Sequence, residues 1–352
     1  MKETLVLKID SQEPEIEKIW IAADFIKKGG LVAFPTETVY GLGADALNPK
    51  AVLALFEAKE RPLDNPPIVH VGNPKDVYSL VKEVPPKAER LMETFWPGPL
   101  TLIFKRSEIV PDVTVAGLDT IAVRMPRHNV ALALLRESHC SIVAPSANLA
   151  GKPSSTSAKH VLDDLNGRID AILDAGLTHI GVESTVLDMT VDPPQVLRPG
   201  GTPYEVLKKV LGKVELHSIA VAEKELQIEK VRSPGMKHKH YAPNADVIVV
   251  EGEVSAVMEK VKKLAKFYKQ KGIKVGVLAT DETAGYYRAD VVKSLGSRSD
   301  LAVIAKNLFK LLREFDFDGV DVIIAEGVPA EGLGLAVMNR LRKASGYKIF
   351  RA

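Results

Sequence analysis

Two stretches with regularly spaced apolar residues flank a segment that has no such period. In the first stretch, apolar residues recur at helical spacing over 16–26, and Gly29-Gly30 follow as a stop signal. A second helix is predicted at 49–60. Short apolar runs predict buried strands at 31–35, 68–71, 100–104, 121–124, 141–145, 185–189 and 195–200. Residues 1–216 are therefore predicted to form a domain with a mixed, twisted sheet flanked by helices.

The last third of the chain alternates between strand and helix patterns. Strands are predicted at 246–250, 274–279 and 321–327, and helices at 254–270, 300–314 and 334–345. Such alternation is typical of a parallel sheet covered by helices. We therefore expect an α/β protein whose residues 246–352 form a smaller, Rossmann-like parallel domain.

Residues 217–245 read as a linker between these domains. The segment lacks a long apolar period and gathers basic side chains and histidines around Ser233-Pro234-Gly235 and His240-Tyr241. A loop of this length is usually functional or disordered. Either it is a solvated basic tether, or it folds over the first domain and closes a site there.

Composition narrows the class of protein only modestly. A chain of 352 residues favours two domains, and a net charge of +2 is too small to indicate nucleic-acid binding by bulk electrostatics. Cys140 is the only cysteine, so no intrachain disulfide can form. The N-terminus has no apolar run typical of a signal peptide, and no membrane-spanning stretch is present, so a cytoplasmic protein is expected.

The familiar nucleotide and metal signatures are missing. NLAGKPSS resembles the end of a Walker A loop, but Ser146 stands where the motif needs its first glycine. Gly41 and Gly43 lack the third glycine of a dinucleotide fingerprint, and no paired Cys/His metal site occurs. A nucleotide site in this chain must be of another kind, with no metal ligands predicted from protein side chains.

Polar clusters nevertheless follow several predicted strands of the first domain, where ligands bind in open α/β sheets. PTETVYGLGADA (35–46) offers Thr36 and Tyr40, although a plain strand–loop junction would look similar. FEAKERPLDNPPIVHV (56–71) places two cations and two polar groups around one loop, either as an anion cradle or as simple helix capping. These four residues are Lys59, Arg61, Asn65 and His70.

Further clusters follow later strands. IVAPSANLAGKPSS (142–155) presents Ser146, Asn148 and Lys152, which suit phosphate or adenine contacts but also an ordinary polar turn. GVESTVLD and VLRPGG place Ser184 and Arg198 at strand boundaries. Several such clusters in one domain are harder to explain by turns than any one of them.

Taken together, these motifs resemble the YrdC-like family. PTETVYGLGADA, EAKxRP with NPPIVHV, PSAN with GKPS, ESTV and LRPG occur in order over about residues 15–215. The RSPGMKHKHYAP segment and the α/β tail resemble the longer, two-domain members. The resemblance implies that L-threonine, bicarbonate or CO2 and ATP give threonylcarbamoyl-adenylate and pyrophosphate, for modification of adenosine 37 in tRNA.

The resemblance also implies site residues and partners. ATP, carrying Mg²⁺, is expected to bind the KxR and SxN signatures and nearby groups, namely Lys59, Arg61, Asn65, Thr120, Ser146, Asn148, Lys152, Arg198, Ser233, His240 and Tyr241. Threonine or its carbamate is expected at Thr36, Tyr40, His70, Ala122, Arg124 and Ser184. The product would pass to a downstream tRNA threonylcarbamoyl transferase complex, and weak tRNA binding is a further expectation.

Adenylation fits these residue types, because it needs positioned cations around the phosphates and no protein nucleophile. Lys59 and Arg61 are the predicted catalytic cations. Lys59 is expected to line the site surface, so that Lys59→Ala would abolish turnover and leave the fold intact. Two alternatives remain open: a module that grips RNA without turnover, and a carbamoyl-transfer domain of the hydrogenase-maturation type.

Overall fold

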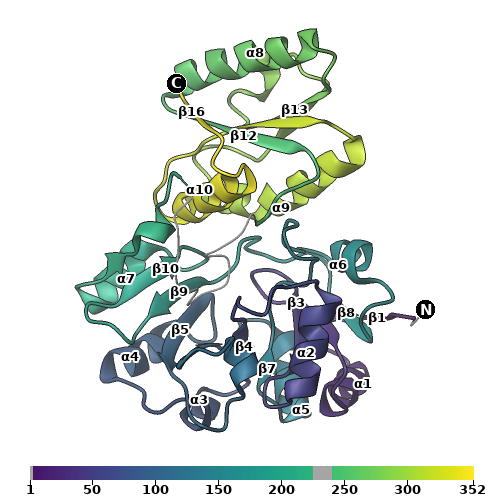
Figure 1. Cartoon of the computed structure of the whole chain (residues 1–352), viewed down its shortest axis with the longest axis vertical. Coiled ribbons are helices and arrows are strands. Elements are labelled where there is room, and N and C mark those ends of the chain that lie inside the picture. The colour runs from purple at the N-terminus through teal and green to yellow at the C-terminus, as the bar shows by residue number, and fades with distance from the viewer. Residues whose placement is uncertain (1–2, 225–239) are drawn as a thin grey trace. The chain divides into compact units, whose positions relative to one another are not determined.

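The computed structural model describes residues 3–224 and 240–352 and divides them into two compact units. Within the described residues, unit 1 comprises 3–150 and 154–220, and unit 2 comprises 151–153, 221–224 and 240–352. Unit 1 is a mixed α/β unit and unit 2 is a parallel α/β unit, as the sequence predicts (Figure 1).

Unit 1 is built on a mixed sheet whose described strands follow the order β1-β8-β2-β3-β7-β4-β6-β5-β9-β10-β11. All seven strands predicted for this domain are present. Strands β5–β6 and β2–β3 pair antiparallel, while β4–β6 and β1–β8 pair parallel. The strands are β1 (Leu5–Lys8), β2 (Val32–Phe34), β3 (Gly41–Asp45), β4 (Ile68–His70), β5 (Leu100–Lys105), β6 (Thr120–Arg124), β7 (Ile142–Val143), β8 (Ala171–Asp174), β9 (Thr185–Asp188), β10 (Gln195–Arg198) and β11 (Glu215–Leu216).

Helices pack against this sheet in two groups. The large core joins the sheet to α2, α4, α6 and α7, and a second core joins it to α1 and α5, which lie side by side in Figure 1. The helices are α1 (Ile16–Lys27), α2 (Pro49–Ala58), α3 (Val77–Leu80), α4 (Pro86–Phe95), α5 (Asn129–Ser138), α6 (Ala158–Leu165) and α7 (Tyr204–Leu211), with short 3-10 turns at Pro74–Asp76, Asp112–Val115 and Ser218–Ala220.

The ends of two predicted helices have clear chemical causes. Helix α1 stops at Lys27 because Gly29 takes a left-handed conformation with φ of 82°, which glycine adopts at no steric cost. Helix α2 starts after Asn48, whose side-chain oxygen accepts hydrogen bonds from the backbone N–H groups of Lys50 and Ala51. Pro49 fits the first helical position, where no N–H is needed.

One stretch predicted as a loop is a strand. Residues 41–45 form β3, which pairs antiparallel with β2. A Cβ atom on Gly43 would lie 2.8 Å from side-chain atoms of both Phe34 and Ile142, so this glycine is needed for packing. Glycine is a poor strand former, and the pattern therefore did not predict a strand here.

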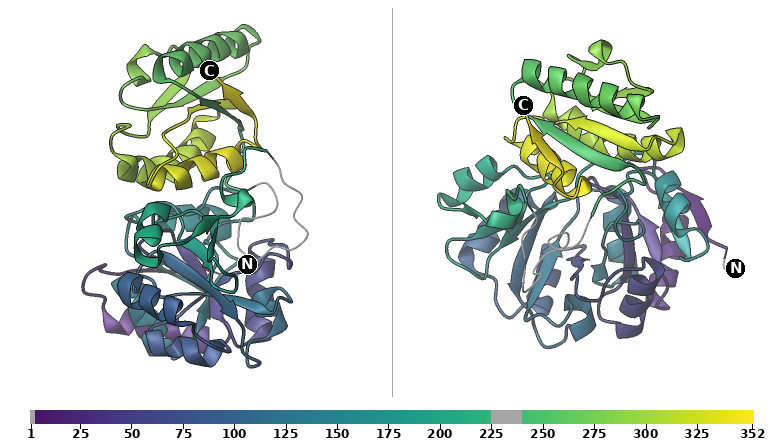
Figure 2. Two further views of the ribbon diagram at one scale, coloured as in Figure 1. Left: turned by 90° about the vertical axis from the view of Figure 1, so that its left-hand side faces the viewer. Right: turned by 45° about the horizontal axis from the view of Figure 1, so that its top comes forward.

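Unit 2 is a five-stranded parallel sheet in the order β14-β13-β15-β12-β16. Figure 2 shows the sheet between α8 on one face and α9 with α10 on the other. Three strands and three helices match the prediction, and β14 and β16 are additional. The elements are β12 (Asp246–Glu251), α8 (Val254–Gln270), β13 (Val275–Ala279), a 3-10 turn (Ala284–Tyr286), β14 (Val291–Ser294), α9 (Leu301–Asp318), β15 (Val322–Glu326), α10 (Leu333–Ala344) and β16 (Ile349–Arg351).

Candidate functional site

Several predicted site residues project from one face of the unit 1 sheet. Side chains alternate between the two faces of a strand, so Thr120, Ala122 and Arg124 share one face of β6, as Ile68 and His70 do on β4. The intervening residues belong to the large core on the other face. A small apolar cluster formed by Ile68, Ile103, Ala122, Val186, Leu197 and Ile219 lies on the shared face. The second core adjoins it, because Ile142, which pairs with His70 across β4 and β7, belongs to that core. We call the shared face the polar face of unit 1.

The KxR and SxN motifs meet in the folded unit. The Lys59 ammonium, at the end of α2, donates hydrogen bonds to the backbone carbonyls of Ser146 and Asn148. The N–H of Ala150 in turn donates to the carbonyl of Lys59, at 2.9 Å. These hydrogen bonds join Lys59 to residues that lie 87 and 89 positions further along the chain.

The prediction that Lys59 merely lines a surface is wrong. Its side chain belongs to the largest fully buried ones, with 1% of the residue exposed. Because its ammonium bonds two backbone carbonyls, replacing it with alanine removes one hydrogen bond from each and leaves a gap, although the Ser146 carbonyl still accepts from the N–H of Asn148 at 3.0 Å. Lys59 therefore orders the 146–148 loop as well as bringing a positive charge to it.

Arg61 and Asn65 form the other part of this loop region. Arg61 Nε donates to the backbone carbonyl of Asn65 at 3.1 Å, and its guanidinium lies 5.9 Å from the ring centre of Phe56. This geometry holds the Arg61 fork at the end of α2. Asn65 is buried, and its side-chain oxygen has no hydrogen-bond partner within the described residues.

A chain of hydroxyl groups links the PTET motif to Arg124. Thr36 Oγ1 lies 2.8 Å from Thr38 Oγ1, and Thr38 Oγ1 accepts a 3.0 Å hydrogen bond from Arg124 Nη1. Thr36 also caps its own turn by bonding the carbonyl of Val39 at 2.6 Å. Thr36 thus has the local capping role that a plain strand–loop junction predicts. It also contacts Thr38, which accepts the hydrogen bond from Arg124.

The hydroxyl of Tyr40 is used within the fold. It donates to the carbonyl of Gly176 at 2.7 Å and accepts from the N–H of Ala175 at 3.2 Å. Burial is the main cause that raises the pKa of Tyr40 well above its usual value. Its ring is fully buried in the large core, so the geometry gives Tyr40 a supporting place under the PTET loop.

His70 is a neutral imidazole in this fold. It lies opposite Arg124 in the β4–β6 register and 6.3 Å from the Phe34 ring, edge to face. Burial, reinforced by the positive charge of Arg124, lowers the pKa of His70 to about 3. Its Nδ1 atom has no hydrogen-bond partner among the residues that the structure describes. A neutral ring with one unused nitrogen can bond a ligand without adding charge.

Ser184 and Arg198 form a second polar group on the neighbouring strands. Arg198 donates to the carbonyl of Ser184 through Nε and Nη2, at 3.1 and 2.9 Å, and to its hydroxyl at 3.2 Å. The same hydroxyl lies 2.8 Å from Thr101 Oγ1. All three residues are buried. The ESTV and LRPG motifs are therefore joined through Ser184, as the sequence grouping implied.

Thr120 and Arg124 mark opposite ends of β6. They are four residues apart, which in a strand corresponds to about 13 Å. They cannot contact the same small group, although Ala122 lies between them on the same face. An extended ligand with two polar ends would be needed to reach both.

Buried polar atoms without hydrogen-bond partners gather in this part of unit 1. Such atoms are uncommon in folded proteins, and each one needs an explanation. Within the described residues, such atoms occur on two predicted residues, Asn65 and His70, and on three unpredicted ones, Glu37, His128 and Thr178. Buried polar atoms near the predicted residues are thus available to bond a ligand, as a ligand site requires.

Three remaining ATP predictions fall in unit 2, and one falls outside the described residues. Lys152 belongs to the short 151–153 segment of unit 2, which Arg313 holds by donating to the carbonyl of Pro153 at 2.6 Å. Tyr241 stacks on Phe309 with ring centres 5.3 Å apart, and His240 lies beside it. Ser233 lies among the residues that are not described.

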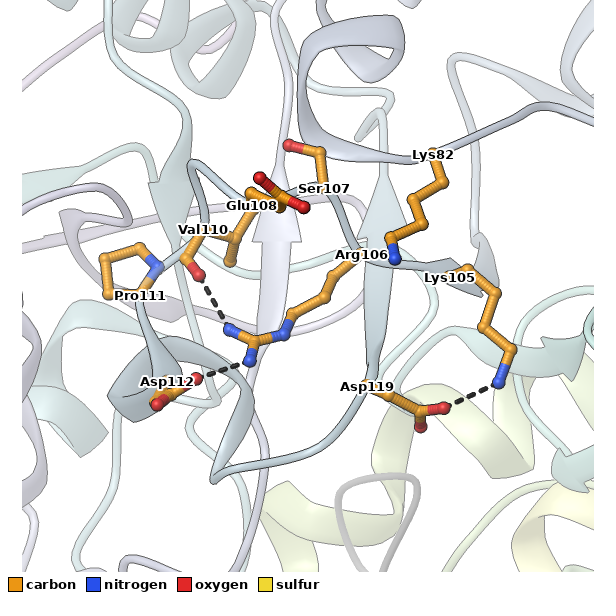
Figure 3. Close-up of a pocket in the computed structure, with 9 residues that line it drawn as sticks. All are labelled: Lys82, Lys105, Arg106, Ser107, Glu108, Val110, Pro111, Asp112 and Asp119. Carbon is orange, nitrogen blue, oxygen red and sulfur yellow. Dashed lines mark hydrogen bonds and ion pairs between the residues drawn. The ribbon is translucent and has the colours of Figure 1, made fainter.

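One cavity of unit 1 is lined by other residues. It has a volume of about 810 Å³, and none of its lining residues belongs to the predicted motifs (Figure 3). Its cations are largely balanced by neighbouring acids, because Lys105 pairs with Asp119 at 2.7 Å and Arg106 pairs with Asp112. The charges of this cavity therefore give no reason to place the phosphates there.

Sequence reasoning missed four residues of the polar face. Glu37 and Thr38 lie inside the quoted PTET motif, and His128 follows Arg124 in RMPRH, so their positions could have been noted. Thr101 carried no signal, because it reads as one residue of an apolar strand. What the sequence could not reveal is that Arg124 reaches Thr38 and Glu37 across the fold.

Metal ligands do not cluster in the part of the chain that the structure describes. No group of three or more His, Cys, Asp or Glu side chains that could hold a metal ion occurs in 3–224 and 240–352. Over the same residues, no helix is long and apolar enough to cross a membrane.

Family models match almost the whole chain. Residues 24–200 match the Sua5/YciO/YrdC model, described as telomere recombination. Residues 203–346 match the model of the threonylcarbamoyl-AMP synthase C-terminal domain.

Relatives of the chain share its full length and both of its units. A protein of Pyrococcus abyssi named threonylcarbamoyl-AMP synthase is 54% identical over 95% of this chain and 96% of its own. One of Bacillus subtilis with the same name is 49% identical over 98% and 96%. The crystal structure of P. abyssi Sua5 complexed with L-threonine matches with a TM-score of 0.95 at 52% identity, covering 99% of this chain and 100% of that one. The chain belongs to the Sua5/YciO/YrdC family, in the two-domain form that ends in a threonylcarbamoyl-AMP synthase C-terminal domain.

Proposed function

We propose that this chain is an L-threonylcarbamoyladenylate synthase. It would convert L-threonine, bicarbonate or CO2 and ATP into threonylcarbamoyl-AMP and pyrophosphate, as a nucleotidyltransferase. The relatives named threonylcarbamoyl-AMP synthase support this proposal, as does the threonine complex of the P. abyssi protein. The product would serve the threonylcarbamoyl modification of adenosine 37 in tRNA.

The observation that carries the proposal is the polar face of unit 1. It combines buried cations, Arg124 among them, with buried polar atoms that lack partners within the described residues, including those of Asn65 and His70. A buried polar atom without a partner costs roughly 1–3 kcal/mol, so a fold that collects several of them is arranged for a polar ligand. A mixed-anhydride ligand with phosphate, carboxylate and hydroxyl groups fits that description.

Phosphates would bind on the side formed by Lys59, Arg61, Ser146 and Asn148, with Asn65, Thr120 and Arg198 assisting. The carbamate oxygen attacks the α-phosphorus and pyrophosphate leaves. The chain's task is to align these groups and to stabilise the added negative charge, for which no protein nucleophile is needed. Lys59 contributes its charge and also fixes the Ser146–Asn148 loop.

Threonine would bind on the side formed by Arg124, Ser184 and His70, with Thr36, Tyr40 and Ala122 beside them. Arg124 suits a carboxylate because its planar guanidinium can donate two parallel hydrogen bonds. His70 is neutral and can bond a hydroxyl without repelling Arg124. Containment matters here, because carbamates lose CO2 and acyl adenylates hydrolyse in water.

Mg²⁺ is expected to enter as part of the nucleotide substrate. Mg²⁺ in nucleotide sites is held largely by phosphate oxygens, and we expect the same here. The roles given to the side chains above do not depend on its position.

Residues 217–245 have a role that we also propose from the sequence. The basic segment, with Ser233, His240 and Tyr241, would close over the bound nucleotide and limit hydrolysis. The product would then pass to a tRNA threonylcarbamoyl transferase complex in the cytoplasm, with weak tRNA binding as an accessory property.

A pyrophosphate-release assay tests the proposal. Release should require ATP, threonine and bicarbonate together, and omission of any one should reduce it to background. The variant Arg124→Gln should lower kcat/KM for threonine by about 100-fold or more, since a charged partner of the substrate is lost. Arg127→Gln, at an exposed position on the same segment, is the matched control. Pyrophosphate release that does not depend on threonine would contradict the proposal, as would salt-dependent RNA binding without any turnover.

A further inference from the structure

Glu37 is a buried carboxylate with unused bonding capacity. Only 5% of the residue is exposed, yet its Oε1 atom has no hydrogen-bond partner within the described residues. Its charged contact among these residues is an ion pair in which Oε2 lies 2.6 Å from Arg124 Nη2. Buried carboxylates normally accept several hydrogen bonds, so this one is poised for a donor that the fold does not supply.

The surroundings fix Glu37 and Arg124 in place. Arg124 Nε donates to the carbonyl of Gly98 at 3.1 Å and Nη1 donates to Thr38 Oγ1 at 3.0 Å. The backbone carbonyl of Glu37 accepts from the N–H of Ile180 at 2.8 Å. A positive and a negative group thus stand side by side in a rigid, buried setting, which matches the two charged ends of an amino acid.

His128 is a second buried group with an unused nitrogen atom. It is 9% exposed, lies four residues after Arg124, and its Nδ1 atom has no hydrogen-bond partner among the described residues. Burial lowers the pKa of His128 to about 4, while the charge of Glu37 favours its protonated form and that of His179 opposes it. Arg124 and, opposite it on β4, His70 are the other charged and titratable groups of the cluster. His128 is neutral near pH 7 and can accept a proton on one ring nitrogen.

We propose that Glu37 binds the α-ammonium group of threonine and accepts its first proton, and that His128 accepts the second proton released as the carbamate forms. This assignment rests on the proposed function. Conversion of an ammonium group and CO2 into a carbamate releases two protons, and the cluster offers two acceptors. No residue among those that the sequence resemblance implied performs this step.

Atoms and charges balance in this step. A proton moves from the threonine ammonium to a Glu37 oxygen, which leaves a lone pair on nitrogen. That lone pair forms a bond to the carbon of CO2, and one C–O π pair moves onto oxygen. The nitrogen then gives its extra proton to His128 Nδ1, and the carbamate anion remains for attack on ATP. Both acceptors return to their resting states by releasing protons to solvent.

Calorimetric titration of two ligands tests the role of Glu37. L-threonine and (2S,3R)-2,3-dihydroxybutanoate share the carboxylate and the side chain and differ only in the ammonium group. Wild-type protein should prefer threonine by about 10- to 100-fold, which is the range of a charge-assisted hydrogen bond. In Glu37→Gln the preference should fall to within about threefold, mainly through weaker threonine binding. Glu37→Asp should retain part of the preference, since it keeps the charge.

A purely positioning role for Glu37 predicts a different result. If the carboxylate only holds Arg124, Glu37→Gln should weaken both ligands alike and leave the preference unchanged, and that result would overturn the proposal. ATP binding in the same samples reports whether the variant is folded. A wild-type protein that binds neither ligand would instead contradict the proposed function itself.

Turnover of His128→Asn tests the second acceptor. General-base assistance contributes about 100-fold or more, so kcat near pH 7 should fall by at least that factor while KM for threonine changes less than about threefold. The loss should shrink as pH rises, because hydroxide and buffer bases replace the imidazole. A fall in kcat that is the same at pH 7 and pH 9 would show that His128 only supports the fold.

Discussion

Each unit buries a glutamate, and the two are treated in opposite ways. In unit 2, Glu326 is fully buried at the end of β15, and its oxygens accept from the N–H of Thr280 at 2.9 Å and from Thr283 Oγ1 at 2.7 Å. The Tyr287 hydroxyl also donates to it. In unit 1, Glu37 is also buried but has, among the described residues, only its ion pair with Arg124.

The difference distinguishes a buried carboxylate that stabilises the fold from one that is available to a ligand. A buried carboxylate that is fully hydrogen-bonded contributes to a unique, rigid fold, whereas one with open bonding positions costs stability until a ligand arrives. Glu251 in unit 2 repeats the first pattern, because it pairs with Arg342 through two hydrogen bonds of 2.8 and 2.9 Å. We therefore expect changes in unit 1 to affect ligands first and changes in unit 2 to affect stability first.

The largest effect is expected in the choice of amino-acid substrate. A site whose buried polar atoms bond the substrate hydroxyl rejects an isostere that lacks it by about 10⁴-fold. Valine should therefore be a very poor substrate beside threonine, measured as kcat/KM in the pyrophosphate-release assay. Serine lacks only the methyl group and should lose roughly 10- to 200-fold. Equal rates with threonine and valine would mean that the polar face does not bond the hydroxyl group of threonine.

Substitution of Lys59 should have the next largest effect, and it should lower both turnover and stability. Lys59→Met keeps the apolar stem but removes the donor to the carbonyls of Ser146 and Asn148. Turnover should fall by about 10²- to 10³-fold, and stability by about 1–3 kcal/mol. Lys50→Met, at an exposed position of the same helix, should change neither. Normal turnover by a folded Lys59→Met protein would remove Lys59 from the phosphate site.

Glu326→Gln should give the reverse pattern. The amide group turns a donor toward groups that already donate, so the free energy of unfolding should drop by about 2–3 kcal/mol in chemical denaturation. Threonine affinity should stay within about twofold of the wild-type value. A marked loss of threonine binding with unchanged stability would break the distinction drawn between the two glutamates.

Acid should destabilise unit 1 through His70. The pKa of His70 lies at about 3 in the folded state, below the ordinary value of 6.5, so the unfolded chain binds the proton more readily. The stabilisation is complete above about pH 6.5 and is lost as pH falls, by about 2 kcal/mol at pH 5. His70→Asn should remove that part of the pH dependence, and the exposed His139→Asn should not. Identical pH dependences for the two variants would contradict a buried neutral His70.

The sequence predicts elements well where apolar periodicity is strong. Helix α8 spans Val254–Gln270 as the pattern indicates, and α1 ends before its glycine pair. Prediction fails where special packing overrides propensity, as in the glycine-containing β3. The short β14 and β16, with partly exposed residues, carry too little apolar signal to be recognised.

The candidate site is predictable in its residue types but not in its connections. The order and grouping of the motifs point to Lys59, Arg124, Ser184 and Arg198. They cannot show that Lys59 is buried against the Ser146 loop, since that contact joins segments 87 residues apart. Nor can they single out Glu37, because an unsatisfied carboxylate is visible only once its surroundings are known.

Mass-spectrometric detection of the product made with ¹³C-labelled bicarbonate tests the proposed reaction itself. Wild-type protein with ATP, threonine and label should form threonylcarbamoyl-adenylate carrying one ¹³C atom. Glu326→Gln should still form it at a temperature where the variant is folded, and Arg124→Gln should form almost none. A wild-type protein that consumes ATP without placing the label in an adenylate would contradict the proposed reaction. Full product formation by Arg124→Gln would contradict the assignment of the polar face as the threonine site.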